Sequence, residues 1–375
     1  MKGCAVWLCV GMVLAWAHLG LSADSVRPER VDAIFTGLKS NNSPGAAVVV
    51  LKNGRMLFTQ GYGFSDLRTR SKIDADTNFR LASVTKQFTA MAVMLLVHDG
   101  KLRYEDRLTD VFPDFPSYGG TITVRNLLNH TSGLQDYEDL MAKPHPNRPP
   151  ESIPQINDAG VLQLLKQQKA PKFVPGTKWA YSNSGYVVLG MIVQKVSGMP
   201  FGEFLQLRLF APLKMEQTLA YEKGKNEVVH RAYGYTRLGS VWRETDQSPT
   251  SATLGDGGVY SSLNDLTKWD DALRNHRLLT EQEMSPAITS VKVRDGSVEE
   301  PDGTPAEYGF GWFLNPYRGR SRMWHYGETV GFRTAIQRFV DEKLTIIVLC
   351  NRADLEASDL ALRVADLYLR ESKGH

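Results

Sequence analysis

The sequence predicts a mixed α/β (α+β) fold, in which an antiparallel sheet flanked by terminal helices carries an inserted all-helical region. Three observations lead to this prediction. Runs rich in β-branched residues lie near both ends of the chain, apolar segments with helical spacing fill the middle, and amphipathic segments lie near the two termini. If the two ends build one sheet, the middle part is an insertion into that sheet domain.

In chain order, a short amphipathic helix is expected first, over residues 31–38, before two strands over 45–51 and 55–61. Asn53-Gly54 between these strands predicts a tight hairpin, because both residues tolerate positive φ. Residues 83–98 form a long apolar stretch that is followed by Asp99-Gly100. This pattern is typical of a buried helix with a glycine stop.

Helical spacing recurs in the middle of the chain, whereas residues 136–158 are rich in Pro, Asp and Asn and predict an irregular excursion. The pattern then returns to strands and closes with an amphipathic helix over 357–369. The expected middle helices are 124–128, 161–168 and 186–196. The expected late strands are 309–314, 334–340 and 344–349.

The N-terminus has the composition of an export signal. Lys2 is followed by an almost purely apolar stretch over residues 4–17 and then by small residues. We therefore predict a signal peptide over residues 1–23, with an uncleaved membrane anchor as the open alternative. The remaining chain, 24–375, is expected to form one compact domain. Its α/β part would comprise about residues 24–80 and 250–375, and its helical part about residues 81–249.

The charge and cysteine content limit the partners and the cellular locations that the sequence is compatible with. The 44 Lys and Arg residues and 41 Asp and Glu residues are interspersed, so no basic run favours a nucleic acid partner. After signal cleavage only Cys350 remains, which excludes an internal disulfide. An exported protein without disulfides suggests a periplasmic or secreted enzyme with no stable membrane insertion.

The first candidate for chemistry is Ser83-Val84-Thr85-Lys86. Three residues are nearly one helical turn, so Lys86 is expected beside Ser83 on one face of an otherwise apolar helix. A desolvated lysine has a lowered pKa and can accept the proton of a serine nucleophile. The structural alternative is a lysine whose ammonium extends to solvent, and Ser-x-x-Lys alone does not decide between the two.

The second candidate is Tyr181-Ser182-Asn183, which follows the turn residues Pro175-Gly176. A tyrosinate beside a lysine can act as a general base, because the cation lowers the phenol pKa. The amide of Asn183 can bond both the lysine and a substrate carbonyl. The structural alternative for Tyr181 is a buried ring with a satisfied hydroxyl.

The third candidate is His325-Tyr326-Gly327, which is expected to precede a strand. His325 could bind a substrate carboxylate or assist proton transfer, and Gly327 would allow close approach of a strand edge to the substrate. A lone histidine is more often structural, and the alternative stays open here.

Together and in this order, the three elements resemble the motifs of the serine β-lactamase and penicillin-binding-protein superfamily. The match is to its class C-like branch, with D-aminopeptidases, D,D-carboxypeptidases and family VIII esterases. The resemblance extends over roughly residues 31–369. Further stretches that carry it are Phe79-Arg80-Leu81-Ala82-Ser83, Asn129-His130-Thr131-Ser132-Gly133-Leu134, Phe173-Val174-Pro175-Gly176 and Tyr308-Gly309-Phe310-Gly311-Trp312.

The resemblance implies a β-lactamase/transpeptidase-like fold with the site between the sheet part and the helical part. It implies that Ser83 is the nucleophile, that Lys86 and Tyr181 are the acid/base pair, and that Asn183 positions the substrate. The oxyanion hole would use the Ser83 N–H and a second N–H within residues 329–332. It implies no metal and no organic cofactor.

The expected function is therefore an exported serine hydrolase of the Ser-x-x-Lys type. It would cleave small amide or peptide substrates, with D-amino-acid-containing ones as leading candidates, through an acyl-enzyme on Ser83. True β-lactamases of this branch usually carry a Lys-Thr-Gly-like third element, and His325 departs from it. A family VIII-type carboxylesterase, a β-lactamase and a non-catalytic binding protein remain as alternatives.

Overall fold

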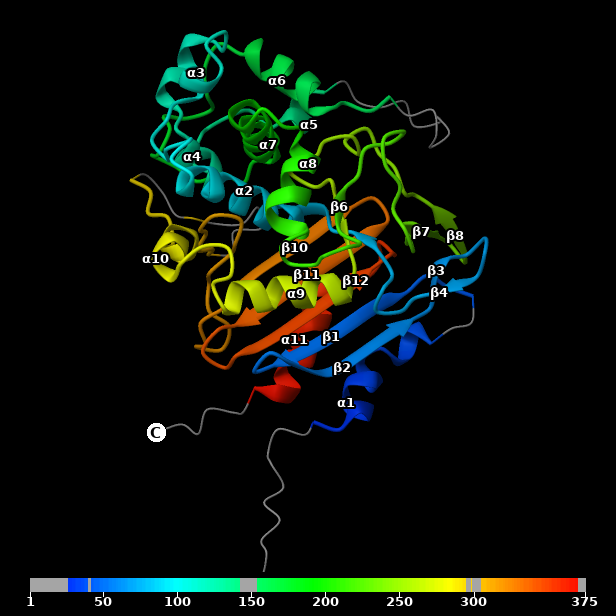
Figure 1. Ribbon diagram of the computed structural model, residues 1–375. Coiled ribbons are helices and arrows are strands. Elements are labelled where there is room, and N and C mark those ends of the chain that lie inside the picture. Colours follow the sequence, from blue (N-terminus) through cyan, green and yellow to red (C-terminus); the bar gives the residue numbers. More distant parts are fainter. Residues whose placement is uncertain (1–25, 40–41, 142–153, 295–297, 299–304, 370–375) are drawn as a thin grey trace, which may run out of the picture.

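A five-stranded antiparallel sheet joins the two ends of the chain in the computed structural model, which describes residues 26–39, 42–141, 154–294, 298 and 305–369 (Figure 1). The strand order is β10-β11-β12-β1-β2, so the first and last strands in sequence lie side by side at its centre. Ala46 pairs with Cys350, for example. The strands are β1 Ala46–Lys52, β2 Arg55–Tyr62, β10 Met323–Thr329, β11 Phe332–Phe339 and β12 Leu344–Cys350.

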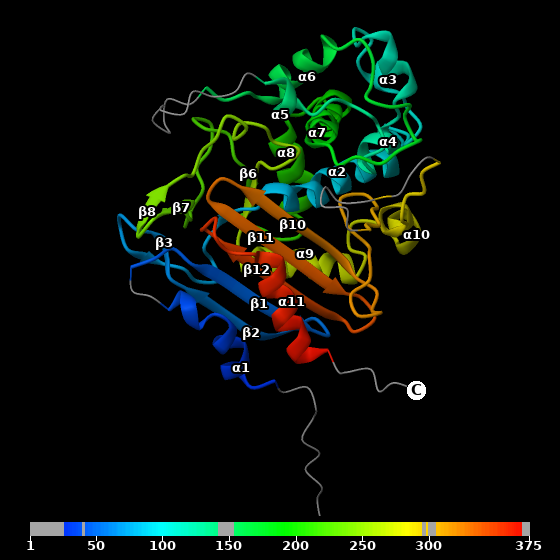
Figure 2. The ribbon, with the colours of Figure 1, turned by 180° about the vertical axis from the view of Figure 1, so that it is seen from behind.

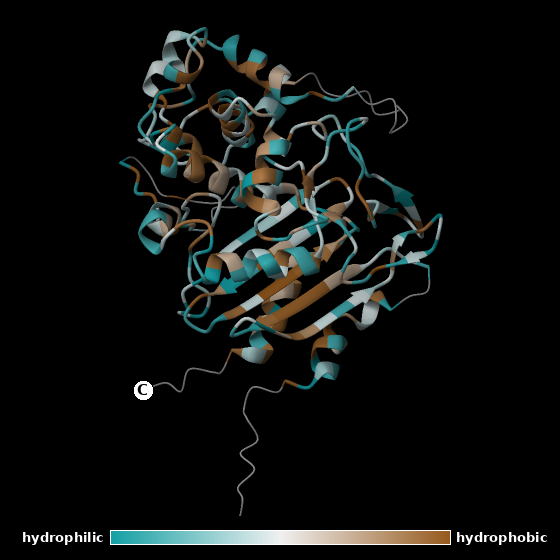
Figure 3. Cartoon of the chain, viewed as in Figure 1, coloured by the Kyte–Doolittle hydropathy of each residue, from teal (hydrophilic) through white to brown (hydrophobic). Residues whose placement is uncertain are grey.

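The central strands β1 and β12 are almost entirely apolar (Figure 3), because both faces of the sheet are covered there. Successive side chains of β1 point to opposite faces, as strand geometry requires. Ala46 and Val48 contribute to the core on one side of the sheet, while Ala47 and Val49 contribute to the core on the other side. The β1–β2 turn has positive φ at Asn53 and Gly54, so the predicted hairpin is confirmed.

Two terminal helices cover one face of the sheet (Figure 2). They are α1 Pro28–Ile34 and α11 Ala357–Tyr368. Val31 of α1 and Val364 of α11 are fully buried in the same core cluster as the strand residues on this face. Cys350 is a free, buried thiol of the same cluster. The prediction of an antiparallel sheet flanked by terminal helices is confirmed.

The opposite face of the sheet packs against α9, Leu263–Arg274. A buried ion pair fastens this helix, because Asp270 Oδ1 accepts bonds from Arg338 Nε at 2.7 Å and from Thr345 Oγ1 at 2.8 Å. Charges this far from solvent are tolerated because each has a hydrogen-bonded partner. The contact fixes the helix against β11 and β12.

The helical region rises beyond the edge strand β10, around the central helices α2 and α7 (Figure 1). Its apolar side chains join the core on the α9 face, so sheet and helical region share one core cluster. The helices are α2 Lys86–His98, α3 Leu108–Val111, α4 Val124–Leu128, α5 Tyr137–Leu140, α6 Asp158–Lys166, α7 Asn183–Ser197 and α8 Phe201–Leu205. A further short helix, α10 Glu281–Met284, lies near the sheet.

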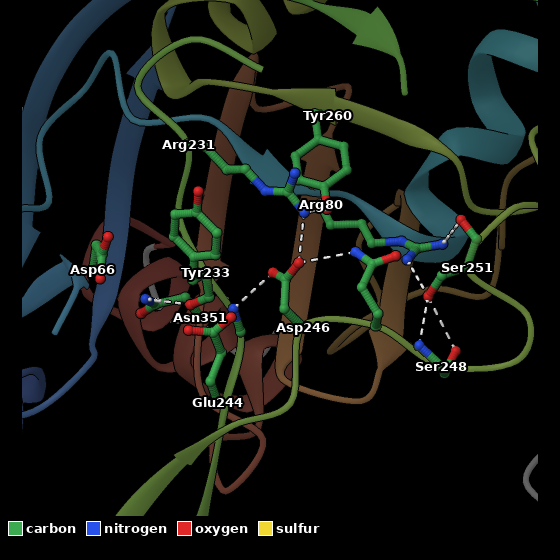
Figure 4. A network of polar contacts seen from close by, with 12 residues as sticks. Asp66, Arg80, Arg231, Tyr233, Glu244, Asp246, Ser248, Ser251, Tyr260 and Asn351 are labelled. Carbon is green, nitrogen blue, oxygen red and sulfur yellow. Dashed lines mark hydrogen bonds and ion pairs between the residues drawn. The ribbon is translucent and has the colours of Figure 1, made fainter. Parts of the chain in front are cut away.

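A network of polar contacts connects residues 231–251 to the rest of the domain (Figure 4). Arg231 forms an ion pair with Asp246 and lies over the rings of three tyrosines, at 4.7 to 5.1 Å from their centroids. Gly234, just beyond Arg231, approaches Gly331 in the β10–β11 turn so closely that a Cβ at Gly331 would meet its backbone. The network therefore braces the tip of the edge hairpin. Three small sheets complete the fold within the described residues. In the first, β3 Phe64–Asp66 pairs with β4 Ser71–Lys72, and in the second β9 Val259–Ser261 lies between β5 Phe79–Arg80 and β6 Leu219–Ala220. In the third, β7 Tyr235–Leu238 pairs with β8 Val241–Glu244.

Two strand predictions near the C-terminus are wrong. Residues 309–314 form no strand, because positive φ at Gly311 turns the chain and leaves only isolated bridges, such as Tyr308 to Phe313. His325-Tyr326-Gly327 does not precede a strand but lies inside β10. The excursion predicted over 136–158 contains α5, and residues 142–153 within it lie outside the described part.

The predicted signal segment, residues 1–23, also lies outside the described residues. Within the described part of the chain, no helix combines the length and the apolar character that crossing a membrane requires.

Candidate active site

Ser83 lies on a tight 3-10 turn, Ala82–Thr85, that leads directly into α2. The turn is reached through Ala82, whose φ of 49° places a non-glycine residue in the left-handed region. Such a conformation costs about 1–3 kcal/mol and persists only where surrounding contacts impose it. Arg80 supplies one of these contacts by donating to Ser251 Oγ at 2.7 Å (Figure 4). Ser83 itself remains partly exposed.

Lys86 lies one turn further on and is completely buried. Its Nζ is 2.9 Å from Ser83 Oγ, 2.8 Å from Asn183 Oδ1 and 3.0 Å from the carbonyl oxygen of Asp256. Burial lowers the pKa of Lys86 to about 8, against the opposing effect of nearby carboxylates. The predicted desolvated lysine beside Ser83 is present, and a substantial fraction of it is neutral in mildly basic solution.

Tyr181 directly precedes α7, and the residues that begin this helix hold its ring beside Lys86. Ser182 caps this helix by accepting from Gly185 N at 3.1 Å, and Ser182 N donates to His130 Nδ1 at 3.1 Å. The Tyr181 ring centroid lies 4.9 Å from Lys86 Nζ. Ser83, Lys86, Tyr181 and Asn183, which come from two distant stretches of sequence, are therefore brought together.

The protonation state of Tyr181 differs from the expected one. Burial raises the pKa of Tyr181 well above its ordinary value, and the hydrogen bond with Ser83 offsets only part of this effect. We expected the Lys86 cation to favour a tyrosinate. In the structure the lysine is itself largely desolvated, and the tyrosine hydroxyl stays protonated as a phenol.

Asn183 is fixed by two carboxylates that sequence reasoning did not identify. Asp136 Oδ2 accepts from the Asn183 backbone N at 3.0 Å, and Glu138 Oε1 accepts from its side-chain Nδ2 at 3.1 Å. Both residues lie in the segment expected to be irregular. Their only sequence signal is Asp136-Tyr137-Glu138, in which Asp136 caps α5 through Glu138 N.

Asp256 is the third carboxylate near Lys86 that the sequence did not indicate. Its backbone carbonyl accepts from Lys86, and its Oδ2 accepts from the Tyr137 hydroxyl at 2.9 Å. The sequence signal was Gly255-Asp256-Gly257-Gly258, which is more typical of a tight turn. The turn brings backbone close enough to α7 that a Cβ at Gly255 would lie 2.3 Å from the Tyr186 carbonyl oxygen.

At Gly327 the edge strand β10 lies against the turn that carries Ser83. A Cβ at this position would lie 2.2 Å from the Leu81 carbonyl oxygen and 3.1 Å from Ser83 N. The close approach at Gly327 is therefore to the backbone of the Ser83 turn, and the expected approach to a substrate stays a prediction. Residues 329–332, where we expected the second oxyanion donor, instead form the end of the hairpin, and Gly331 packs on Gly234.

His325 is placed differently from the expectation of a group that meets substrate. It is 1% exposed, and burial lowers its pKa to about 3. Nδ1 lies 2.6 Å from the Tyr326 carbonyl oxygen, so Nδ1 carries the proton, and Nε2 then accepts from the Tyr308 hydroxyl at 3.1 Å. A neutral, buried imidazole supplies no cation for a substrate carboxylate.

His130 and a group of aromatic rings form the wall behind Lys86 and Tyr181. Burial lowers the pKa of His130 well below its ordinary value, and the Lys86 charge lowers it further. The His130 ring lies 4.4 Å from the ring centroid of Tyr181 and 4.6 Å from that of Tyr308. The rings of Tyr181 and Tyr186 lie 4.9 and 5.5 Å from Nζ of the completely buried Lys86. Within the described residues, no group of three His, Cys, Asp or Glu side chains could hold a metal ion.

The fold, together with a strained serine turn at the junction of sheet and helices, defines the class as a serine hydrolase of β-lactamase-like architecture. The chain belongs to the β-lactamase family, whose model matches residues 31–369. It is 31% identical over 357 residues to penicillin-binding protein 4* of Bacillus subtilis, covering 91% of this chain and 76% of that protein.

Two further relatives are an aminopeptidase and an amidase. The chain is 29% identical over 341 residues to the D-aminopeptidase of Brucella anthropi. The match covers 87% of this chain but only 59% of that protein. The solved D-amino acid amidase of Ochrobactrum anthropi SV3 in complex with L-phenylalanine superposes with a TM-score of 0.74 at 25% identity, covering 90% of this chain and 98% of the amidase. The predicted family resemblance and fold class are confirmed.

Proposed function

We propose that the protein is an exported serine hydrolase that cleaves small amide or peptide substrates through an acyl-enzyme on Ser83. The observation that carries this proposal is the 2.9 Å contact between Ser83 Oγ and the fully buried Nζ of Lys86. A serine hydroxyl is a poor nucleophile until a base removes its proton, and a neutral lysine in a desolvated pocket is such a base.

In the acylation step, neutral Lys86 takes the hydroxyl proton while Ser83 Oγ bonds to the substrate carbonyl carbon. The carbonyl oxygen becomes an oxyanion, which the backbone N–H of Ser83 and an N–H of β10 beside Gly327 would stabilise. The carbon–nitrogen bond then breaks, and the amine leaves with the proton that Lys86 received. In deacylation, water gives its proton to Lys86 and attacks the acyl carbon. The bond to Ser83 Oγ then breaks, the proton returns to Ser83, and the acid leaves.

Tyr181 acts in this scheme as a protonated phenol. Its hydroxyl, in contact with Ser83, donates toward the leaving amine and is restored by the Lys86 ammonium, so that one proton passes along the pair. Burial supports this role, since it raises the pKa of Tyr181 and keeps the donor protonated over the whole working range.

The substrate class follows from the relatives and from the charge of the site. An aminopeptidase and an amidase named for D-amino acids are among them, so a small D-amino-acid amide or peptide is the leading candidate. Three carboxylates surround Lys86, and the two nearby histidines are neutral. An anionic substrate, such as a β-lactam carboxylate, would be repelled, because most charges near the site are also negative.

Export is part of the proposal because Lys2, the apolar stretch over residues 4–17 and the small residues after it have the composition of a signal peptide. Edman sequencing or mass spectrometry of protein from a host that secretes it tests this point. A mature N-terminus near residue 24 supports it, whereas an intact Met1 in the cytoplasmic fraction contradicts it.

Labelling by a fluorescent phosphonate tests the acyl-enzyme. We expect the wild type and the exposed-serine control Ser240→Ala to label equally, and Ser83→Ala and Lys86→Ala to remain unlabelled with unchanged circular dichroism. Unimpaired labelling of Ser83→Ala would exclude the nucleophile. No labelling of any variant at any pH would favour the alternative of a non-catalytic binding protein.

Turnover of three chromogenic substrates then separates the enzyme classes. We expect hydrolysis of a D-alanyl anilide to exceed that of its L-enantiomer and that of nitrocefin. Turnover of a short p-nitrophenyl ester alone would replace the amidase proposal by the carboxylesterase alternative, and turnover of nitrocefin alone would favour a β-lactamase.

A further inference from the structure

The short segment 136–138 binds the start of α7 at three points. Asp136 accepts from the backbone N of Asn183 at 3.0 Å, and Glu138 accepts from the side chain of Asn183 at 3.1 Å. Between them, Tyr137 N donates to Ser184 Oγ at 2.7 Å. Because Asp136 also accepts from Glu138 N, the two carboxylates are held relative to each other as well as to Asn183.

These contacts fix which way the Asn183 amide points. A carboxylate can only accept hydrogen bonds, so Glu138 must face the amide NH₂ group. The amide oxygen then points to Lys86 Nζ, which it meets at 2.8 Å. A reversed amide would place its NH₂ group against the lysine ammonium and its oxygen against the carboxylate, and both contacts would be lost.

Glu138 is also the exposed member of the charged groups that surround Lys86. The carboxylates of Asp256, Asp136 and Glu138 each favour the ammonium form of the lysine, in opposition to burial. The remaining groups that face Lys86 are neutral in the working range or carry only a ring face. They are His130, His325, Tyr181 and Tyr186.

We propose that Glu138 is a positioning residue that orients the Asn183 amide toward Lys86 and whose charge stabilises the protonated form of that lysine. The inference rests on the proposed function, in which neutral Lys86 is the base. Glu138 thereby raises the pH at which the enzyme becomes active. It does so from the solvent-exposed side, without contact with the reacting atoms.

Glu138→Gln separates the charge from the hydrogen bond, since the glutamine oxygen still accepts from Asn183. We expect the acidic limb of the acylation rate to move to lower pH by about half a unit, the effect of one charge acting across a single amide near a protein surface. Below the midpoint of the limb, Glu138→Gln should therefore react about threefold faster than wild type, with an unchanged plateau at high pH. A purely structural residue would give no such gain.

The acylation rate is measured with an uncharged p-nitrophenyl ester, so that no substrate charge interacts with Glu138. Asp139→Asn is the matched control, because Asp139 is the neighbouring exposed acid and pairs with Lys172 instead. Its profile should coincide with that of wild type. Glu138→Leu removes charge and acceptor together, and we expect the limb to shift and the plateau to fall.

Two outcomes overturn the inference. One is a Glu138→Gln profile that coincides with that of wild type, and the other is an equal shift in Asp139→Asn. Failure of the proposed function has a different signature, namely no acidic limb in the wild type or unimpaired acylation in Lys86→Ala. The two failures are therefore distinguishable in the same experiment.

Discussion

The pH dependence of acylation is the sharpest consequence of the buried lysine. Burial lowers the pKa of Lys86 to about 8, and only the neutral amine can accept the Ser83 proton. The neutral fraction is about one tenth at pH 7 and about nine tenths at pH 9, so the acylation rate should rise about tenfold between these values and then level off. An unshifted lysine would instead keep gaining activity beyond pH 10.

The assay is the burst phase or kcat/KM for an uncharged p-nitrophenyl ester, corrected at each pH by the rate of Ser83→Ala. Tyr181→Phe serves as an internal control. Its rate should be lower throughout, but its acidic limb should keep the same midpoint because the limb belongs to Lys86. A rate that is flat from pH 7 to 9, or a limb that disappears in Tyr181→Phe, would refute the assignment of the base.

Three other substitutions test the packing and the proton donor. Gly327→Ala should lower the free energy of unfolding in urea by about 1–3 kcal/mol and remove most of kcat/KM, because its Cβ would lie 2.2 Å from a carbonyl oxygen. The control Gly37→Ala, which has open space around it, should change neither the stability nor kcat/KM. Asp270→Asn should lower the free energy of unfolding by about 3–5 kcal/mol, because it leaves a buried arginine unpaired, while Asp359→Asn in an exposed pair should change it by less than about 1 kcal/mol. Tyr181→Phe should lower turnover of an amide by about 10²- to 10⁴-fold with little change in melting temperature, and unimpaired turnover would remove the phenol from the mechanism.

Much of the fold could be predicted because the pattern of the sequence and the burial agree. The run that became β12 is apolar except for Thr345, and it lies in the sheet with both faces covered. Helix α9 was missed although a signal was present. Leu263, Leu266 and Trp269 recur at helical spacing, and Ser262 caps the helix by accepting from Asp265 N. Many charged residues between them concealed the apolar stripe.

The site was predictable only where its residues form local motifs. Ser83 and Lys86 are one turn apart, so spacing alone places them together. Asp136 and Glu138 lie more than 40 residues before Asn183, and Asp256 lies 170 residues after Lys86. Their proximity arises from the packing of α5 and the 251–258 turn on α7, which no local pattern encodes. His325 likewise bonds Tyr308, which directly precedes the residues 309–314 that were wrongly expected to form a strand.

The same burial that lowers the pKa of Lys86, as the proposed role of a base requires, would make the site unstable if the lysine stood alone. A fully buried ammonium without partners is strongly unfavourable, and the three acceptors within 3.0 Å of Nζ remove that penalty. Acceptors and carboxylates together, however, favour the ammonium, which is the inactive form in the proposed mechanism. The neutral states of His130 and His325 then matter, because a second buried cation would drive the lysine pKa lower still and weaken these bonds. The pKa of Lys86 is thus a balance between burial, which lowers it, and the carboxylates of Asp256, Asp136 and Glu138, which raise it. In the proposed mechanism, a change in either effect shifts the pH of activity before it changes the chemistry.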